Sequence, residues 1–555
     1  MINKFVPLSP DPFLNSDPDM SLAKFGHINA IVEYINNSGG LKLSGDGLIS
    51  ATIKTVLDPA GSSTPLRMSN SSITNYGGGS ITSNTAFGTN ALGLNSTGVN
   101  NTAFGGAASY NNTSGGNNTA VGYLALALSN ASNNTAIGYR SLSANTSGTQ
   151  NVAVGSDALL SNITGSANTV VGYQALSLNT TGANSVAIGR GALQNNTTGQ
   201  ENVAVGRFAL NVSTTGVQNT SIGTNSLRAN TTGFNNVAVG HQSLRSLTTG
   251  SSNTALGTDA SYTATTASNN VSVGQSALYF NVVGISNVAI GSGSLFNNTA
   301  SNNTAVGYEA ALSNTIGVEV TAIGYRALRN STGDENTAVG FEALYSNTTG
   351  ASNVAIGRVA MTLNTTGSAN TAVGTAALRI NTTGIENAAF GEAALRNNQT
   401  GSNNTAIGKN ALYNNYSSAN TAVGFQAAYN TQNGVEVVAV GYNALQNAQA
   451  NGNTGIGYSA MSAVQTGQLN STLGAYTNAG TTGSSNVLLG YGANAVNFGG
   501  SIVMGRDAAA TGNNQFVVGS TVSPAGTVDT AAVTPTQRWK VKINGVDYYI
   551  ALEPA

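Results

Sequence analysis

Small and branched apolar residues recur at a fixed distance along most of this chain. The segment "NVAIGRVAMTLNTTG" at 353–367 shows the pattern, which is an apolar triplet, a glycine, a second apolar group and a polar turn. We call the glycine that closes each triplet the marker glycine and number positions from it. The 27 marker glycines run from Gly88 to Gly519, and 18 of their 26 intervals are 17 residues long. Such a short, constant period is typical of a solenoid, in which each repeat contacts mainly its neighbours.

The residue types within one period favour β-structure. Helical repeats need more than about 30 residues for two helices and a turn. Val, Ile and Thr before the marker glycine favour strands, and the Asn, Thr and Gly that follow favour turns. We therefore predict an all-β parallel β-solenoid of about 27 short coils. Each coil would hold two short strands and two turns, and coils ~4.8 Å apart would form a rod of roughly 130 Å.

The apolar positions predict a core that is larger than one coil. Positions −1 and −3, such as Val121 and Thr119, face one side of the strand, and Ala120 between them faces the other. Position +4 is Leu or Met in 19 of the 27 coils. Leaving the apolar side chains at these positions exposed to water would cost about 25 cal/mol per Å² of apolar surface, repeated over many coils. We therefore predict that several identical chains share one core.

Two polar positions recur with similar regularity. Position −4 is Asn in 22 coils, in a series that begins with Asn84 and Asn101. Stacked Asn side chains can form a hydrogen-bonded ladder along a solenoid. Position +10 is often glycine, as at Gly182, Gly199 and Gly216. We predict that this glycine supplies a positive φ in the turn.

The repeats divide the chain into three regions. Residues 1–80 do not repeat, and their apolar spacing predicts a helix at 20–37 followed by short strands. Residues 81–520 form the repetitive shaft. Residues 521–555 contain two alternating segments around Asn544–Gly545, which predicts a hairpin with a type I′ turn. This hairpin either covers the open edge of the last coil or sets the register of three chains.

Two segments resemble the head repeats of trimeric autotransporter adhesins. They are "NSVAIGRGAL" at 184–193 and "SIVMGRDAAATGNNQFVVG" at 501–519. The resemblance covers roughly residues 80–520 and implies a left-handed parallel β-roll with three chains packed side by side. The sequence shows no signal peptide, coiled-coil stalk or membrane barrel of that family, so we do not expect an autotransporter. Residues 1–80 are similar in organisation to the attachment regions of phage fibre and appendage proteins.

The composition argues against several classes of function. The net charge is −1, which gives no electrostatic footprint for nucleic acid. There is no cysteine, and no apolar run has the ~20 residues that span a membrane. The two histidines, His27 and His241, have no metal cluster or catalytic triad around them in the sequence. We expect no catalytic residue, no metal and no cofactor.

A capsule depolymerase is the enzymatic alternative, and we rank it low. Such an enzyme needs two carboxylates about 5–10 Å apart. Stacked coils could bring Asp334 and Glu335 near Glu319, or Glu386 near Glu392. No further acidic residues converge on these pairs, and depolymerase rods usually carry long irregular insertions.

Aromatic residues at position +1 are the candidate binding residues. In neighbouring coils they would stack into ladders that can contact sugar rings. The six possible glycan-contact residues are Tyr308, Tyr325, Phe341, Phe425, Tyr442 and Tyr458. The alternative, which we favour, is that these rings only stabilise the β-stack. Arg190 and Arg207 lie at the same position and are either contacts for acidic glycans or solvated charges.

Together these features predict a structural virion protein, a phage tail fibre or related appendage. It would be a homotrimer exposed on the particle surface, joined to tail, neck or capsid proteins through residues 1–80. Its partner would be a glycan or protein of the host surface, without nucleic-acid binding or membrane insertion. The main alternative is a bacterial surface adhesin. An ice-binding solenoid, which needs a flat exposed array of threonines, is a further alternative that this chain fits less well. Here threonine alternates with valine at position −3, and the threonines of the outer NTT turns lie on a curved surface.

Overall fold

The computed structural model describes residues 83–519 and the strand residues 538–543 and 546–551. Strands and turns make up this part of the chain, and no helix occurs in it. The described residues divide into two compact units between Tyr308 and Glu309. The helix predicted at 20–37 and the short strands predicted after it lie outside the described residues.

Each coil contributes one strand of three residues that ends directly before its marker glycine. The first unit contains β1 (Thr85–Phe87), β2 (Thr102–Phe104), β3 (Thr119–Val121), β4 (Thr135–Ile137), β5 (Val152–Val154), β6 (Thr169–Val171), β7 (Val186–Ile188), β8 (Val203–Val205), β9 (Thr220–Ile222), β10 (Val237–Val239), β11 (Thr254–Leu256), β12 (Val271–Val273), β13 (Val288–Ile290) and β14 (Thr304–Val306). The second unit contains β15 (Thr321–Ile323), β16 (Thr337–Val339), β17 (Val354–Ile356), β18 (Thr371–Val373), β19 (Ala388–Phe390), β20 (Thr405–Ile407), β21 (Thr421–Val423), β22 (Val438–Val440), β23 (Thr454–Ile456), β24 (Ser471–Leu473), β25 (Val487–Leu489), β26 (Ile502–Met504), β27 (Phe516–Val518), β28 (Arg538–Ile543) and β29 (Val546–Ala551).

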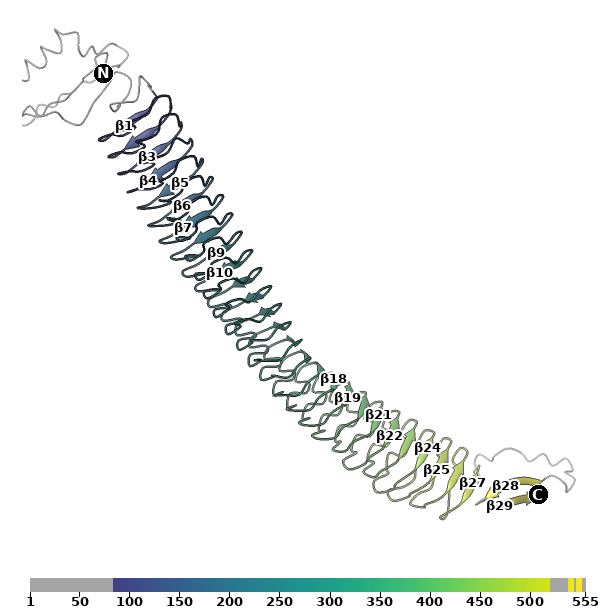
Figure 1. Cartoon of the computed structure of the whole chain (residues 1–555). Coiled ribbons are helices and arrows are strands. Elements are labelled where there is room, and N and C mark those ends of the chain that lie inside the picture. Colours follow the sequence, from purple (N-terminus) through teal and green to yellow (C-terminus); the bar gives the residue numbers. More distant parts are fainter. Residues whose placement is uncertain (1–82, 520–537, 544–545, 552–555) are drawn as a thin grey trace, which may run out of the picture. The chain divides into compact units, whose positions relative to one another are not determined.

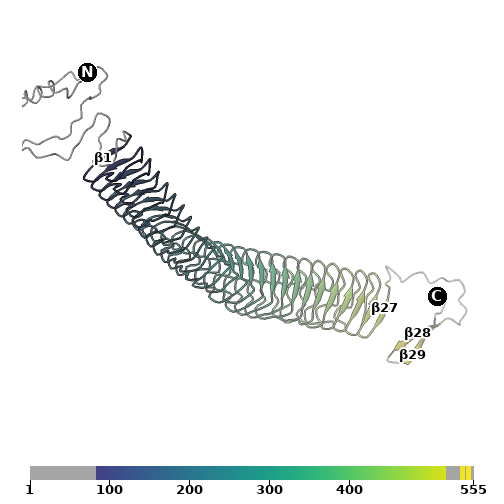
Figure 2. The same ribbon diagram turned by 45° about the horizontal axis from the view of Figure 1, so that its top comes forward.

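Within each unit, every coil strand pairs in parallel with the next one along the chain. The register keeps equivalent positions opposite each other, so that Ala86 faces Ala103 and Phe87 faces Phe104. The strand arrows accordingly follow one another along one side of the coils, in Figure 1 and in the turned view of Figure 2. This arrangement confirms the predicted parallel β-solenoid of about 27 coils.

The second strand predicted for each coil is not formed in residues 83–519, with the exception of isolated bridges near the end. After the marker glycine the chain runs through turns, because positions +2 and +4 adopt left-handed φ angles. These angles are 53° at Gln174 and 49° at Leu176. A residue with such a φ cannot continue an extended strand. The turns still stack, since the Leu176 amide donates to the Ala192 carbonyl at 2.9 Å.

The interior of each coil is filled by small side chains and one leucine. Ala120 of β3 is fully buried, as are Ala125 and Leu126 after it. The predicted facing of the strand residues is therefore confirmed. The prediction that the leucine row needs a shared core is wrong, because a single coil already encloses it. Position −1 behaves differently, and Ile188 at that position remains 39% exposed.

The predicted asparagine ladder is present, and a second one runs beside it. At position −4, the Oδ1 of Asn151 accepts the backbone amide of Asn168 in the next coil at 3.0 Å. The second ladder, at position +7, was not predicted; there Asn179 Nδ2 donates to Asn162 Oδ1 at 2.7 Å. Both ladders meet at position +10, where the Gly182 carbonyl accepts from Asn168 and Asn179. These bonds satisfy buried amides that would otherwise destabilise the coil.

The prediction of a positive φ for the glycine at position +10 is wrong. Gly182, Gly199 and Gly216 all lie outside the left-handed region, which is occupied instead by marker glycines such as Gly189 at 127°. The glycine is required for close packing. A Cβ atom on Gly199 would lie 2.2 Å from the Gly216 carbonyl oxygen and 2.4 Å from Asn196 Oδ1. The two asparagine ladders therefore leave room only for a hydrogen at this position.

The two C-terminal strands differ from the coil strands in length and in the direction of their pairing. β28 and β29 pair antiparallel, with Ile543 opposite Val546. This pairing confirms the two predicted strands of the hairpin, while the connecting Asn544–Gly545 lies outside the described residues. The two alternative roles of the hairpin stay predictions.

Candidate glycan-contact surface

Position +1 directly follows the marker glycine, and the sharp turn at that glycine sets the direction of its side chain. Gly424 has a φ of 133° and Gly441 has the same value, which L-residues rarely adopt. Phe425 and Tyr442 follow these glycines in consecutive coils. The turn repeats in every coil, so aromatic residues at position +1 of successive coils come to lie one above another at the coil spacing.

The aromatic ladder of β21–β23 forms as predicted. Phe425 and Tyr442 stack with ring centroids 5.0 Å apart and planes at 17°, and Tyr442 and Tyr458 stack at 5.0 Å and 5°. The rings of Tyr442 and Tyr458 are 44% and 46% exposed, whereas Phe425 is half-buried. Tyr476, at position +2 of the next coil, extends the series with its ring 5.1 Å from Tyr458 and tilted by 55°. Because neighbouring rings cover each other's faces, the ladder presents ring edges and tyrosine hydroxyl groups to solvent, and these are the parts that can contact a glycan.

The other predicted ladder is divided between the two units. Tyr325 and Phe341 of the second unit stack at 5.2 Å with planes at 8°, and both are exposed. Tyr308, the third predicted member, is the last residue of the first unit and is 45% exposed. Stacking is thus established for Tyr325 and Phe341, and the glycan contact stays a prediction for all six residues.

An ion-paired arginine pair lies beside Tyr325. Arg326 lies with its guanidinium 4.9 Å from the Tyr325 ring centroid. Arg326 and Arg329 both donate to the carboxylate of Glu309, at 2.9 Å and 2.7 Å. The hydrogen bond that Arg329 donates to Glu309 raises the pKa of its guanidinium, so this arginine stays charged. The carboxylate compensates one of the two positive charges and so weakens the attraction of this cluster for an anion.

A second row of aromatic residues, at position +5, was not predicted. Tyr262 and Tyr279 stack at 5.0 Å in the first unit, and Tyr413 and Tyr429 stack at 4.9 Å in the second. Burial raises the pKa of the Tyr279 hydroxyl, which therefore stays protonated at neutral pH. The sequence signal was available, because aromatic residues occupy position +5 in consecutive coils.

The two arginines singled out in the sequence lie on an aromatic ring. The guanidinium of Arg190 is 5.6 Å from the Phe208 ring centroid, and that of Arg207 is 5.1 Å from it. Cation–π contacts of this kind are worth about 0.5–1 kcal/mol at exposed sites. Arg190 and Arg207 are therefore stacked and are not simply solvated charges.

Of the acidic residues considered for catalysis, Glu319 and Glu335 occupy position −5 of successive coils and so come close together as expected. Glu386 and Glu392 lie at opposite ends of β19. Asp334 Oδ1 accepts the backbone amide of Val318 at 3.0 Å, and Glu335 accepts the Ser352 hydroxyl at 3.0 Å. Glu392, at position +1, forms an ion pair of 2.9 Å with Lys409. In residues 83–519 and the two terminal strands, no group of three His, Cys, Asp or Glu side chains is placed to hold a metal ion.

The same described portion contains no helix that is long and apolar enough to cross a membrane. No protein-family model matches the chain, and no curated protein matches it. The binding chemistry of the chain therefore has to be inferred from the surfaces described above.

Proposed function

We propose that the chain is a structural virion protein, a phage tail fibre or related appendage that forms a rigid trimeric rod for attachment to a host. The proposal rests on the outer row, which we define as the residues at position −1. In the first unit, its most exposed members are Phe87, Phe104, Ile137, Val171, Ile188, Ile222, Leu256 and Ile290. In the second unit, they are Ile323, Ile356, Phe390, Ile407, Ile456, Leu473, Met504 and Val518.

The sheet face that carries the outer row has the character of an interface. None of the strands β1–β27 contains a charged residue. Parallel sheets in folded proteins occur almost only with both faces covered. Large exposed apolar patches are rare on monomeric soluble proteins and mark sites of association. This face is therefore suited to burial against another protein surface.

The best match for that face is another copy of the same chain. The outer row repeats once per coil, at the strand spacing of ~4.8 Å. A partner that covers the whole row needs apolar residues with the same period over the same length, and a second copy has both. The resemblance to adhesin head repeats favours three copies and a left-handed roll. Residues 1–80 would then join the trimer to the particle.

The location of the chain can be tested with antibodies raised against residues 83–519. We expect gold-labelled antibodies to decorate a thin rod on virus particles in electron micrographs. Labelling of bacterial envelopes in cultures that contain no particles would contradict a virion protein and favour the surface adhesin. Labelling of cytoplasmic material alone would contradict both.

The aromatic ladder of β21–β23 gives a separate prediction. Replacing Phe425, Tyr442 and Tyr458 together by alanine removes the three stacked rings and the two hydroxyl groups that the ladder presents to a glycan. We expect binding of the purified rod to host cells to fall at least tenfold, with the oligomeric state unchanged. Alanine at Tyr123 and Tyr139, a stacked pair at the same position in the first unit, is the matched control. Unchanged adsorption of the triple variant would show that these rings only stabilise the stack.

A further inference from the structure

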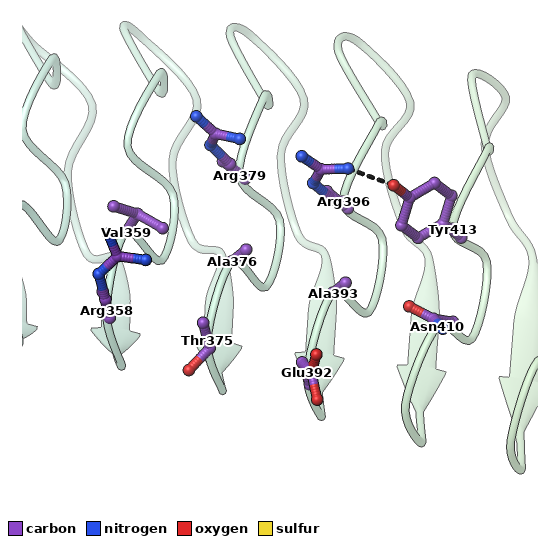
Figure 3. A pocket seen from close by; sticks show the side chains of 10 residues that line it. All are labelled: Arg358, Val359, Thr375, Ala376, Arg379, Glu392, Ala393, Arg396, Asn410 and Tyr413. Atoms are coloured by element: carbon purple, nitrogen blue, oxygen red, sulfur yellow. Dashed lines mark hydrogen bonds between the residues drawn. The ribbon is translucent and has the colours of Figure 1, made fainter.

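A groove crosses four successive coils of the second unit, from β17 to β20. It has a volume of about 390 Å³. Figure 3 shows its side chains in two rows, one with Arg379, Arg396 and Tyr413 and the other with Arg358, Thr375 and Glu392. The first row occupies position +5 and the second position +1. Arg379 and Arg396 thus follow each other at the strand spacing, and Arg358 lies in the other row.

The groove carries uncompensated positive charge. Its one acidic side chain, Glu392, is paired with Lys409 at 2.9 Å. The ion pairs of the described residues do not include Arg358, Arg379 or Arg396. By contrast, Arg329 occupies the same position +5 in an earlier coil and forms an ion pair with Glu309, which it shares with Arg326.

One hydrogen-bond donor of the groove, the Nε atom of Arg379, lacks an acceptor. This atom is buried and has no hydrogen-bond partner among the described residues. A buried donor without an acceptor is destabilising, and more so when the group is charged. The other two arginines are oriented by aromatic residues. Arg396 donates to the Tyr413 hydroxyl, and the guanidinium of Arg358 lies 5.7 Å from the Phe341 ring centroid. A bound anion would supply the missing acceptor.

We propose that this arginine groove binds an acidic polysaccharide through its carboxylate or sulfate groups. Guanidinium groups form bidentate hydrogen bonds with such planar or branched anions, and successive sugars along the rod would place successive charges. Tyr413, whose ring lies between Arg396 and Tyr429, closes one end of the groove. The arginine groove lies between the stacked pair Tyr325–Phe341 and the ladder of β21–β23 in the order of the coils. The proposal names the ligand class of the host attachment proposed above and rests on that function for its biological meaning.

The first unit contains the same arrangement in a closed form. Arg207 at position +1 is followed by Arg228, Arg245 and Tyr262 at position +5 of the next coils, and Arg245 donates to the Tyr262 hydroxyl. There Phe208 occupies position +2, where the groove has Val359. Its ring lies 5.1 Å from the guanidinium of Arg207 and 5.5 Å from that of Arg228. In the first unit Phe208 thus fills the space between the arginines. In the groove the smaller Val359 stands at that position, and Arg358 and Arg396 lie beside Phe341 and Tyr413 instead.

The closed arrangement supplies both a blocking variant and a control. Val359→Phe places in the groove the residue that the chain itself uses at position 208, and the φ angles at the two positions, 52° and 55°, are alike. Arg379→Gln removes the unpartnered charge. Arg245→Gln removes an arginine with the same position and the same tyrosine partner as Arg396 but outside the groove.

The test uses the full chain and two fluorescent probes, an oligogalacturonate and a heparin oligosaccharide, with a maltose oligomer of equal length as the neutral control. We expect at least one acidic probe to bind, the neutral oligomer not to bind, and added salt to weaken binding. Val359→Phe and Arg379→Gln should each weaken it about 10- to 100-fold, and Arg245→Gln should have no effect.

Each other outcome overturns the inference. Failure of both acidic probes, equal binding of the neutral oligomer, or indifference to Val359→Phe would each exclude an acidic glycan in this groove. Displacement of the probe by equimolar inorganic sulfate would reduce the site to one for a small anion. Antibody decoration of virus particles together with failed binding would refute the groove alone. Binding together with labelling of bacterial envelopes would refute the virion function alone.

Discussion

Alanine in place of Gly199 is expected to open the coils on either side of it. The new methyl group would meet the Gly216 carbonyl oxygen at 2.2 Å and Asn196 Oδ1 at 2.4 Å. The carbonyl is backbone and accepts a hydrogen bond from Asn202, so it cannot easily move away. Overpacking of this kind typically costs about 1–3 kcal/mol. Since a solenoid is stabilised mainly by contacts between neighbouring repeats, the loss should be local. Hydrogen exchange measured by mass spectrometry should show faster exchange in residues 196–216 than in distant coils.

Two further variants separate packing from backbone conformation. Gly199→Asn should destabilise as much as Gly199→Ala, because the φ of Gly199 is not left-handed and the larger side chain meets the same atoms. Gly512→Ala is the control, since its added Cβ would meet only the flexible Gln515 side chain, at 3.3 Å. If asparagine at position 199 gave wild-type exchange rates, the close-packing explanation would be wrong and a positive φ would be the better one.

Lysine at three neighbouring positions of the outer row is expected to dissociate the rod into single chains. The side chains of Ile188, Val205 and Ile222 lie on the open sheet face. In a monomer, the ammonium groups of lysines at these positions would therefore remain in water. In a trimer that shares this face, the same substitutions bury unpaired charges, at several kcal/mol for each. Sedimentation velocity should therefore show a shift to the monomer without loss of β-structure in circular dichroism.

The matched control carries the same added charge on another part of the same coils. Thr181, Thr198 and Thr215 are exposed at position +9, in the outer turn. Lysine at these three positions should leave the oligomer intact. If both triple variants dissociated, net charge would be the cause, and if neither did, the outer row would not be the interface.

Sequence reasoning reached the features that depend on local periodicity. The spacing of the marker glycines gave the coil count, and the alternation of Thr119, Ala120 and Val121 gave the inward and outward faces. The −4 asparagines gave a ladder. Each of these follows from one residue type recurring at one position, because stacking identical coils places identical residues above one another.

What sequence reasoning missed depends on contacts between coils. The left-handed φ of Leu176 replaces a second strand, and leucine has no intrinsic preference for that conformation. The tight fit at Gly199 involves the neighbouring coil's carbonyl and an asparagine ladder that was itself unpredicted. The arginine groove could not be predicted from the pattern of charges alone, because it depends on the space that Val359 leaves and that Phe208 fills in the first unit.

The proposed trimeric fibre depends on the outer row being shared by three copies of the chain. Sedimentation equilibrium of the full chain at micromolar concentration measures this most directly. The expected mass is three times that of the 55.6 kDa chain. A mass of 55.6 kDa under these conditions would contradict the proposed fibre, because the uncharged face of β1–β27 would then be stable in water by itself.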